Sequence, residues 1–312
     1  MIRQKTISKN VSIKGIGLHS GETVKLTLKP GKPDTGIVFV RKIKKRSCEI
    51  KVDPFVVSDT KLCSTLKKDE FKIMTVEHIM SALYACAIDN VVIEVLGTEI
   101  PILDGSSNPF IYLIQSAIPV EQDVDKKFIR IKKALKFEVD GKFAMLEPYE
   151  GFKIDFSIEF PHPVFANRNN QIVIDLYKDS YFDEIARART FGFMQEVEFL
   201  RSNGLAKGGS LDNAIVMDEY KIINNDRLRY EDEFVRHKVL DAIGDLYLGG
   251  HPIIGKFTAF KSGHEINNQL LRLLMNDKSA YEIINIDHDQ TIFDQVNIHN
   301  QKLENNFNEV MV

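Results

Sequence analysis

The sequence predicts an α+β protein built from two units of like topology that face one another. The first observation is size: 312 residues, 44% of them hydrophobic, are enough for two domains with real cores. The second is an order of elements that occurs twice, in which strands are followed by a helix, a strand and another helix. We expect these last three elements at 75–85, 90–96 and 109–117, and again at 233–246, 256–260 and 265–275. No clear residue-level repeat accompanies this order.

Charge and cysteine usage exclude several classes of protein. The net charge is -3 and the pI is about 6.3, so the chain has no global attraction for nucleic acid. Three cysteines without a C-x-x-C pair favour a reducing compartment. The N-terminus has no apolar core of signal-peptide length, and no apolar run approaches the ~20 residues that span a bilayer. We therefore expect a cytoplasmic monomer, with peripheral membrane contact left open.

The first half begins with strands and continues into a helix. Val24, Leu26 and Leu28 alternate with polar neighbours, which is typical of a half-buried strand. Thr75 is expected to cap the first helix at its N-terminus. This helix has an apolar stripe on one face and small residues together with His78 on the other. We therefore expect it to be buried on both sides.

The domain boundary is expected where the hydrophobic pattern is interrupted. Residues 121–127 are charged and lack a period, so we place an N-terminal domain at 1–124 and a C-terminal domain at 125–285. The second domain starts with strands, among them a hairpin with the turn Asp140-Gly141. The segment 286–312 is polar and asparagine-rich, and we interpret it as a C-terminal tail.

One predicted helix concentrates ionisable side chains on a single face. Within 233–246, His237, Asp241 and Asp245 follow one another at intervals of four residues beside an apolar stripe. An imidazole and a carboxylate one turn apart can bind the same cation, and zinc takes both kinds of ligand. Gly244 lies in this face, where a side chain would block close approach. The alternative interpretation is a helix with a polar, solvated face.

His78 is the best candidate for a third ligand. It lies on the corresponding helix of the first half, and two like units packed by these faces would bring it to His237 and Asp241. Glu77 adjoins it, and a carboxylate beside a metal ligand is well placed to take a proton from water. The alternative for Glu77 is a structural role, because negative charge is favourable in the first turn of a helix.

Further polar residues extend this candidate site. His264 heads a helix, where the dipole favours a neutral imidazole, and Asp245 would counter that by accepting a ring N–H. Such a pair makes a general acid or an electrostatic stabiliser. The alternative is a histidine that caps its own helix. Thr190 and Lys238 are potential oxyanion donors. The apolar segment 190–217 falls between the repeated elements and either fills a core or builds a ligand wall.

Seven stretches together resemble the bacterial UDP-3-O-acyl-N-acetylglucosamine deacetylases. In family order they are GIGLHSG (15–21), TVEH (75–78), IPILDGS (100–106), RARTFGF (187–193), GGS (208–210), FVRHKVLDAIGDL (234–246) and KSGH (261–264). The departures lie outside these motifs, in the basic run 42–46 and in the tail. The resemblance implies two α+β domains whose helices pack between two outer sheets, with the active site at the domain interface.

The resemblance also implies a role for each polar residue. The metal ligands fall on His78, His237 and Asp241. The metal is zinc, with iron(II) as an alternative in the cell. The general base falls on Glu77, and His264 matches a general acid or charge stabiliser that Asp245 orients. Thr190 and Lys238 match groups that stabilise the oxyanion and hold the substrate.

The implied substrate is UDP-3-O-(3-hydroxyacyl)-N-acetylglucosamine, whose N-acetyl group is hydrolysed in the committed step of lipid A synthesis. The segment 190–217 matches the wall of an acyl-chain tunnel. The residues expected to contact the substrate are Leu18, His19, Phe191, Val197, Ala206, Ser210, Ala214 and Val216. Burial in such a tunnel supplies about 0.8 kcal/mol per methylene. A fatty substrate also suggests transient contact with the inner membrane surface.

Two other functions stay open on the sequence. A metal amidohydrolase acting on another nucleotide sugar would use the same ligands, although the apolar segment 190–217 argues against a substrate without an acyl chain. A non-catalytic binding protein on the same scaffold is the second, although pure binding needs no base such as Glu77.

Overall fold

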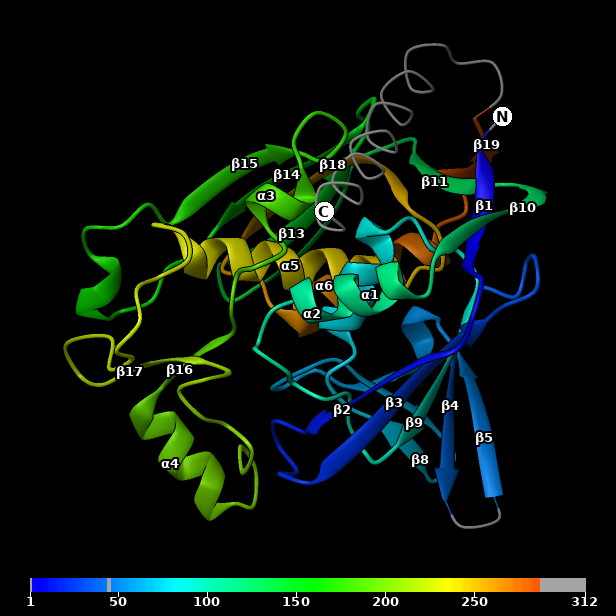
Figure 1. Ribbon diagram of the computed structural model, residues 1–312. Helices are drawn as coiled ribbons and strands as arrows, with labels where there is room; N and C mark the ends of the chain where they lie inside the picture. Colours follow the sequence, from blue (N-terminus) through cyan, green and yellow to red (C-terminus); the bar gives the residue numbers. More distant parts are fainter. Residues whose placement is uncertain (1, 44–45, 287–312) are drawn as a thin grey trace.

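Two large sheets enclose a group of helices in the computed structural model, which describes residues 2–43 and 46–286 (Figure 1). A five-stranded sheet has the strand order β2-β3-β9-β4-β5, and a seven-stranded sheet contains β11 to β15, β18 and β19. Helices α1, α2, α5 and α6 lie between them. The prediction of an α+β fold with helices between two outer sheets is confirmed.

The five-stranded sheet comes from the first hundred residues. Its strands are β2 (Val11–Ile16), β3 (Thr23–Pro30), β4 (Ile37–Ile43), β5 (Arg46–Lys51) and β9 (Val91–Leu96). The predicted alternation in β3 is confirmed, because its three apolar side chains are fully buried and its lysines point outward. The short strands β6 (Val57–Asp59), β7 (Thr65–Lys68) and β8 (Phe71–Ile73) form a separate sheet after the 3-10 turn η1 (Pro54–Val56).

The seven-stranded sheet comes from the second half of the chain. Its strands are β11 (Lys127–Ile131), β12 (Leu135–Val139), β13 (Lys142–Glu147), β14 (Phe152–Ser157), β15 (Gln171–Asp175), β18 (Ile253–Phe260) and β19 (Tyr281–Asn285). β18 is central, antiparallel to β13 and parallel to β11 and β14. The predicted hairpin joins β12 to β13, and Asp140 and Gly141 both have positive φ, as a two-residue turn of this kind requires.

The helices that carry the site pack closely in the middle of the molecule. They are α1 (Glu77–Ala85), α2 (Asn108–Ser116), α5 (Glu233–Tyr247) and α6 (His264–Asn276). Every residue of α1 is buried, which confirms the expectation of burial on both sides. A Cβ at Gly244 would lie 2.0 Å from the carbonyl oxygen of Glu77, so only glycine lets α5 approach α1 this closely. Among residues 2–43 and 46–286 no helix is long and apolar enough to cross a membrane.

A smaller lobe projects beside this core. It contains the parallel strand pair β16 (Phe191–Phe193) and β17 (Ile215–Met217) and the helix α4 (Met194–Ser202) (Figure 1). The remaining short elements are the 3-10 turn η2 (Pro163–Phe165) and helix α3 (Tyr181–Glu184).

The structure corrects two expectations. Thr75 does not cap α1: it has a φ of 60°, and its hydroxyl donates instead to the buried carboxylate of Glu99. The segment 121–127 is not irregular, because most of it belongs to β10 (Pro119–Asp125), which pairs with β1 (Arg3–Ile7). No residue of β10 is buried, so the strand carries no apolar alternation that the sequence could reveal.

The division into 1–124 and 125–285 stays a prediction, and its boundary falls at the end of β10. Part of the basic run 42–46 and nearly all of the predicted tail 286–312 lie outside the described residues.

Candidate active site

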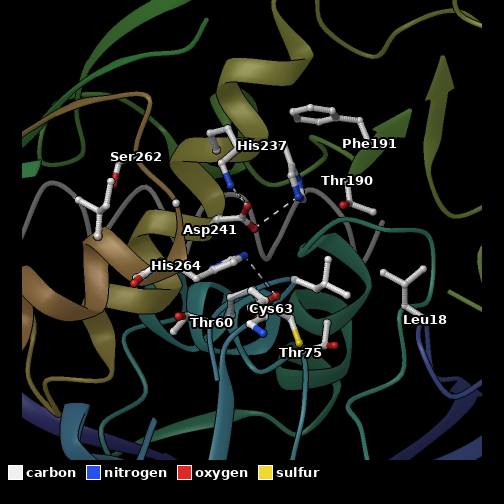
Figure 2. A pocket seen from close by; sticks show the side chains of 18 of the residues that line it. Leu18, Thr60, Cys63, Thr75, Thr190, Phe191, His237, Asp241, Ser262 and His264 are labelled. Atoms are coloured by element: carbon white, nitrogen blue, oxygen red, sulfur yellow. Dashed lines mark hydrogen bonds and ion pairs between the residues drawn. The ribbon is translucent and has the colours of Figure 1, made fainter. Parts of the chain in front are cut away.

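Three potential metal ligands converge where α1 meets α5. Nε2 of His78 and Nε2 of His237 lie 3.5 and 3.4 Å from the same Oδ1 of Asp241. The two imidazole rings stand almost perpendicular, with centroids 5.1 Å apart. One ligand atom from each of the three residues lies within 4.8 Å of the others, and all three side chains are buried. Figure 2 shows His237 and Asp241 directed into the pocket.

The protonation states of this cluster suit a divalent cation. The ring Nδ1 of His237 bonds the carbonyl of Ala188 at 3.0 Å, which leaves Nε2 free to offer a lone pair. Burial lowers the pKa of His237 to about 4, so the ring is neutral. Burial opposes ionisation of Asp241, but neighbouring positive groups such as Lys238 hold its pKa well below the usual value. Two imidazoles and one carboxylate are a ligand set typical of zinc.

Glu77 is the first residue of α1 and faces the same pocket. Its Oε2 accepts a hydrogen bond of 3.0 Å from the backbone N–H of Ser64, and its side chain is almost completely buried. Burial raises the pKa of Glu77 to about 7, with His264 and His78 acting in the opposite direction. A carboxylate with this pKa exchanges protons readily near neutral pH. A favourable interaction with the helix dipole therefore does not by itself explain why Glu77 is buried and faces this pocket.

His264 forms the other side of the pocket from the first residue of α6. Its Nδ1 lies 2.9 Å from Oδ2 of Asp245, and its Nε2 lies 3.8 Å from Oε1 of Glu77. Burial disfavours the charged ring, but Asp245 and then Glu77 outweigh it and raise the pKa of His264 to about 9. The imidazolium is therefore the favoured form at neutral pH.

Thr190 and Phe191 face α5 across the pocket (Figure 2). The backbone N–H of Thr190 donates to the carbonyl of Gly105, and its carbonyl accepts from Ile215, so the residue is held on both sides. Gly105 has a φ of 84°, and a Cβ there would clash with the backbone of residue 213. Lys238 also lines the pocket, with its ammonium 2.8 Å from Oδ2 of Asp241.

These side chains line two neighbouring cavities. The first measures about 610 Å³ and contains the ligand cluster, Glu77 and His264, whereas Asp245 lies behind His264. The second measures about 350 Å³ and adjoins α4. It is lined by all eight residues that the sequence assigned to substrate contact: Leu18, His19, Phe191, Val197, Ala206, Ser210, Ala214 and Val216. Leu18 and His19 line both cavities, so the two lie side by side.

His19 marks the junction of the two cavities. Its side chain is buried, yet neither ring nitrogen has a hydrogen-bond partner among the described residues. Its backbone N–H donates to Glu99, which fixes the loop that carries it. Buried polar groups without partners are rare, so a group able to bind this imidazole is expected in the pocket.

Sequence reasoning missed several residues of the first cavity. They are Thr60, Leu62, Cys63, Lys142, Phe160 and Lys261, and Ser64 lies directly behind them. Lys261 belongs to the KSGH motif and could have been noticed there. The others come from loops and strand ends that carry no periodic or spacing signal.

Comparison with known proteins agrees with this geometry. The sequence model of the family UDP-3-O-acyl N-acetylglycosamine deacetylase matches residues 4–276. A UDP-3-O-acyl-N-acetylglucosamine deacetylase of Thioalkalivibrio sulfidiphilus is 52% identical over 284 residues, which cover 91% of this chain and 93% of that protein. Proteins of the same name from Nitrosococcus oceani and Chromobacterium violaceum are also 52% identical, and the alignments cover 93% and 92% of this chain and 96% and 95% of those proteins. The chain therefore belongs to the UDP-3-O-acyl N-acetylglycosamine deacetylase family and is an amide-hydrolysing enzyme, as its motifs predicted.

Proposed function

We propose that this protein hydrolyses the N-acetyl group of UDP-3-O-(3-hydroxyacyl)-N-acetylglucosamine with the help of a bound zinc ion. The products are UDP-3-O-acyl-glucosamine and acetate, and the reaction is the committed step of lipid A synthesis. The observation that carries the proposal is the junction of two sites. A buried His-His-Asp cluster and Glu77 line one cavity, and a second cavity whose wall is largely apolar lies beside it. The names of the relatives contain both the acyl group and the N-acetyl sugar of such a substrate.

His78, His237 and Asp241 would hold the metal between the proposed domains 1–124 and 125–285. A divalent ion there supplies a Lewis acid and makes a water molecule more acidic, with zinc the expected ion and iron(II) an alternative. Glu77 acts as the general base and receives the proton of the attacking water. Its pKa of about 7 matches that task at neutral pH.

His264 acts as the general acid in the second half of the reaction. When the C–N bond breaks, Nε2 gives its proton to the departing amine nitrogen of the sugar. Asp245 holds Nδ1 at 2.9 Å and so keeps the ring charged and fixed in orientation. Nε2 lies 3.8 Å from Oε1 of Glu77, so base and acid act on neighbouring atoms of one amide.

Thr190 and Lys238 stabilise the negative charge that develops on the acetyl oxygen. Both line the first cavity, and the backbone contacts of Thr190 hold it before substrate binds. A preorganised donor of this kind is typically worth about 3 kcal/mol in the transition state. Lys238 is held by Asp241, so its charge is part of the site rather than free in solution.

The acyl chain occupies the second cavity, where Leu18, Phe191, Val197, Ala206 and Ala214 surround it. Each buried methylene contributes about 0.8 kcal/mol, which is enough to select an acylated sugar over a bare one. The diphosphate then lies in the first cavity. Lys142 and Lys261 in its wall supply the positive charge that a diphosphate requires.

The first test is acetate release from UDP-3-O-acyl-N-acetylglucosamine before chelation, after chelation and after zinc is restored. We expect activity to be lost with the metal and to return with zinc. Activity that survives chelation, in protein shown by metal analysis to be free of metal, would contradict a metal-dependent reaction. Absence of activity in every state would favour a binding protein on this scaffold.

A second substrate separates the proposal from its closest rival. UDP-N-acetylglucosamine presents the same amide and the same diphosphate but no acyl chain. We expect its kcat/KM to be lower by orders of magnitude, because the second cavity stays empty. Equal turnover of the two compounds would favour an amidohydrolase with a different natural substrate.

We also propose that the enzyme works as a cytoplasmic monomer in transient contact with the inner membrane surface. The unpaired state of all three cysteines is what a reducing compartment maintains. Near the second cavity, Phe199 and Leu211 expose 68% and 42% of their surface, and such side chains favour a lipid surface. Failure to sediment with anionic vesicles in the presence of substrate would refute membrane contact.

A further inference from the structure

Ser64 lies between the two carboxylates that the proposed reaction depends on. It precedes β7, is 1% exposed and does not belong to any of the family motifs noted in the sequence. Its backbone N–H donates to Oε2 of Glu77 at 3.0 Å, and its hydroxyl donates to Oδ1 of Asp245 at 2.6 Å. One residue therefore binds the base on α1 and the carboxylate on α5 that orients His264.

The hydroxyl of Ser64 is one of three side-chain donors that hold Asp245. The two oxygens of Asp245 accept hydrogen bonds from Ser64, from Nδ2 of Asn267 at 2.9 Å and from the ring of His264 at 2.9 Å. The last two donors both come from α6, and Ser64 approaches from the first half of the chain. A buried carboxylate keeps its rotamer and charge when donors surround it, and bonds to charged acceptors are the strong ones.

The loop that carries Ser64 is itself tightly held. The carbonyl of Ser64 accepts a hydrogen bond from Val76, so the loop closes onto the start of α1. Thr75, just before Val76, has a φ of 60°, a conformation that a β-branched residue rarely adopts. Its hydroxyl donates a hydrogen bond to Glu99. The absent side chain of Gly244 lets α5 reach this point. Ser64 is thus fixed before substrate arrives.

We propose that Ser64 is a positioning residue that holds Asp245, and through it His264, in register with Glu77. This inference rests on the proposed deacetylase function. The hydroxyl fixes the Asp245 carboxylate, which fixes the His264 ring, whose Nε2 lies 3.8 Å from the Glu77 carboxylate. Ser64 does not line either cavity, so it acts on the chemical step and not on substrate binding.

Three substitutions at this position test the proposal. Ser64→Ala keeps the backbone N–H on Glu77 and removes the bond to Asp245, so we expect kcat to fall about tenfold or more while KM changes less than about twofold. Ser64→Cys keeps the shape but replaces the hydroxyl with a weak donor and should resemble alanine. Ser64→Thr keeps the hydroxyl and should restore most of kcat. The matched control is Ser58→Ala, an exposed residue whose hydroxyl makes a long hydrogen bond of 3.4 Å to the carbonyl of Thr65.

A double-mutant cycle with Asp245→Asn identifies the path of the effect. If Ser64 acts through Asp245, the loss of kcat caused by Ser64→Ala should shrink to about twofold or less in the Asp245→Asn background. An undiminished loss in that background would overturn the proposal. So would an alanine variant with wild-type kcat, or a threonine variant as slow as the alanine one. Thermal unfolding of every variant separates lost chemistry from lost fold.

A measurement without substrate keeps this inference distinct from the proposed function. The ring Nδ1 proton of His264, bonded to Asp245, should give a low-field proton NMR resonance that disappears in His264→Gln. We expect Ser64→Ala to shift or broaden it and Ser58→Ala to leave it unchanged. An unchanged resonance in a folded Ser64→Ala protein would refute positioning by Ser64, even in an enzyme that released no acetate.

Discussion

The two cavities that meet at His19 are built in opposite ways. The first lies between α1, α5 and α6, where Gly244 brings backbone against backbone. Glu77 and Asp245 are buried there, and His264, Lys238 and Thr190 are partly buried. The second is enclosed by the projecting lobe, whose helix α4 has no buried residue. Arg201 joins that helix to the neighbouring turn through the carbonyls of Ala206 and Gly209.

Under the proposed function, this difference means that the proton-transfer groups and the wall for the acyl chain are held in place by different kinds of structure. Groups that move protons need fixed positions within a fraction of an ångström, and a packed core supplies them. A wall that accepts an acyl chain needs only apolar surface, which a peripheral lobe provides. Substitutions in the first cavity should therefore slow every substrate alike, whereas substitutions in the second should change the dependence on acyl length.

Removal of the base should have the largest effect. We expect Glu77→Gln to lower kcat by about 10² to 10⁴, because general base catalysis contributes that much, and to do so equally for long and short acyl chains. The control is Glu198→Gln on the exposed side of α4, which should leave kcat unchanged. A loss that depended on acyl length would break the separation between the two cavities. The measurement is single-turnover acetate release over a series of acyl lengths.

The close contact of α1 and α5 should be the next most sensitive feature. Gly244→Ala places a Cβ 2.0 Å from the carbonyl of Glu77, and neither backbone can give way cheaply. We expect the free energy of unfolding to fall by about 3 kcal/mol or more, with loss of activity. Gly263→Ala is the control, since its φ is -151° and nothing lies within 4 Å of the added Cβ. Equal stability of both variants in urea unfolding would contradict the packing argument.

The sequence predicted which side chains meet in the first cavity better than it predicted their surroundings. His237 and Asp241 share a helical face, which periodicity reveals, and burial of α1 follows from its small residues. The close approach at Gly244 follows from the same reasoning. The proximity of His78 to these ligands was inferred from a repeated order of elements, not from any local signal.

Other features were beyond the sequence for physical reasons. Ser64 is thirteen residues from Glu77 and 181 from Asp245, and its role depends on a loop that closes only in three dimensions. Thr75 looked like a cap because its residue type suits one, but tertiary contact with Glu99 overrides that preference. β10 showed no period because it buries no residue on either face.

The pH dependence sharpens the comparison within the first cavity. The rate should rise as pH passes about 7, where Glu77 loses its proton, and fall above about 9, where His264 loses its own. Asp245→Asn removes the largest of the charges that raise the pKa of His264, so this pKa falls and the alkaline limb should move down by about one pH unit or more. The check is kcat/KM from pH 5 to 10. An unmoved alkaline limb would remove His264 as the acid.

The smallest expected effect concerns the second cavity and is the most selective. Ala214→Val adds two methyl groups to the wall, and displacement of one methylene costs about 0.8 kcal/mol, or about fourfold in kcat/KM for a substrate that fills the cavity. A short-chain substrate should be unaffected. Either substrate should also be unaffected in Phe199→Ala, because this residue is 68% exposed and does not line the cavity. If Ala214→Val slowed both substrates equally, the wall would be coupled to the proton-transfer groups, and the division between packed core and peripheral lobe would not hold. If Ala214→Val slowed only the long-chain substrate, residue 214 would help to set the acyl length that the enzyme accepts. It would then have no role in catalysis.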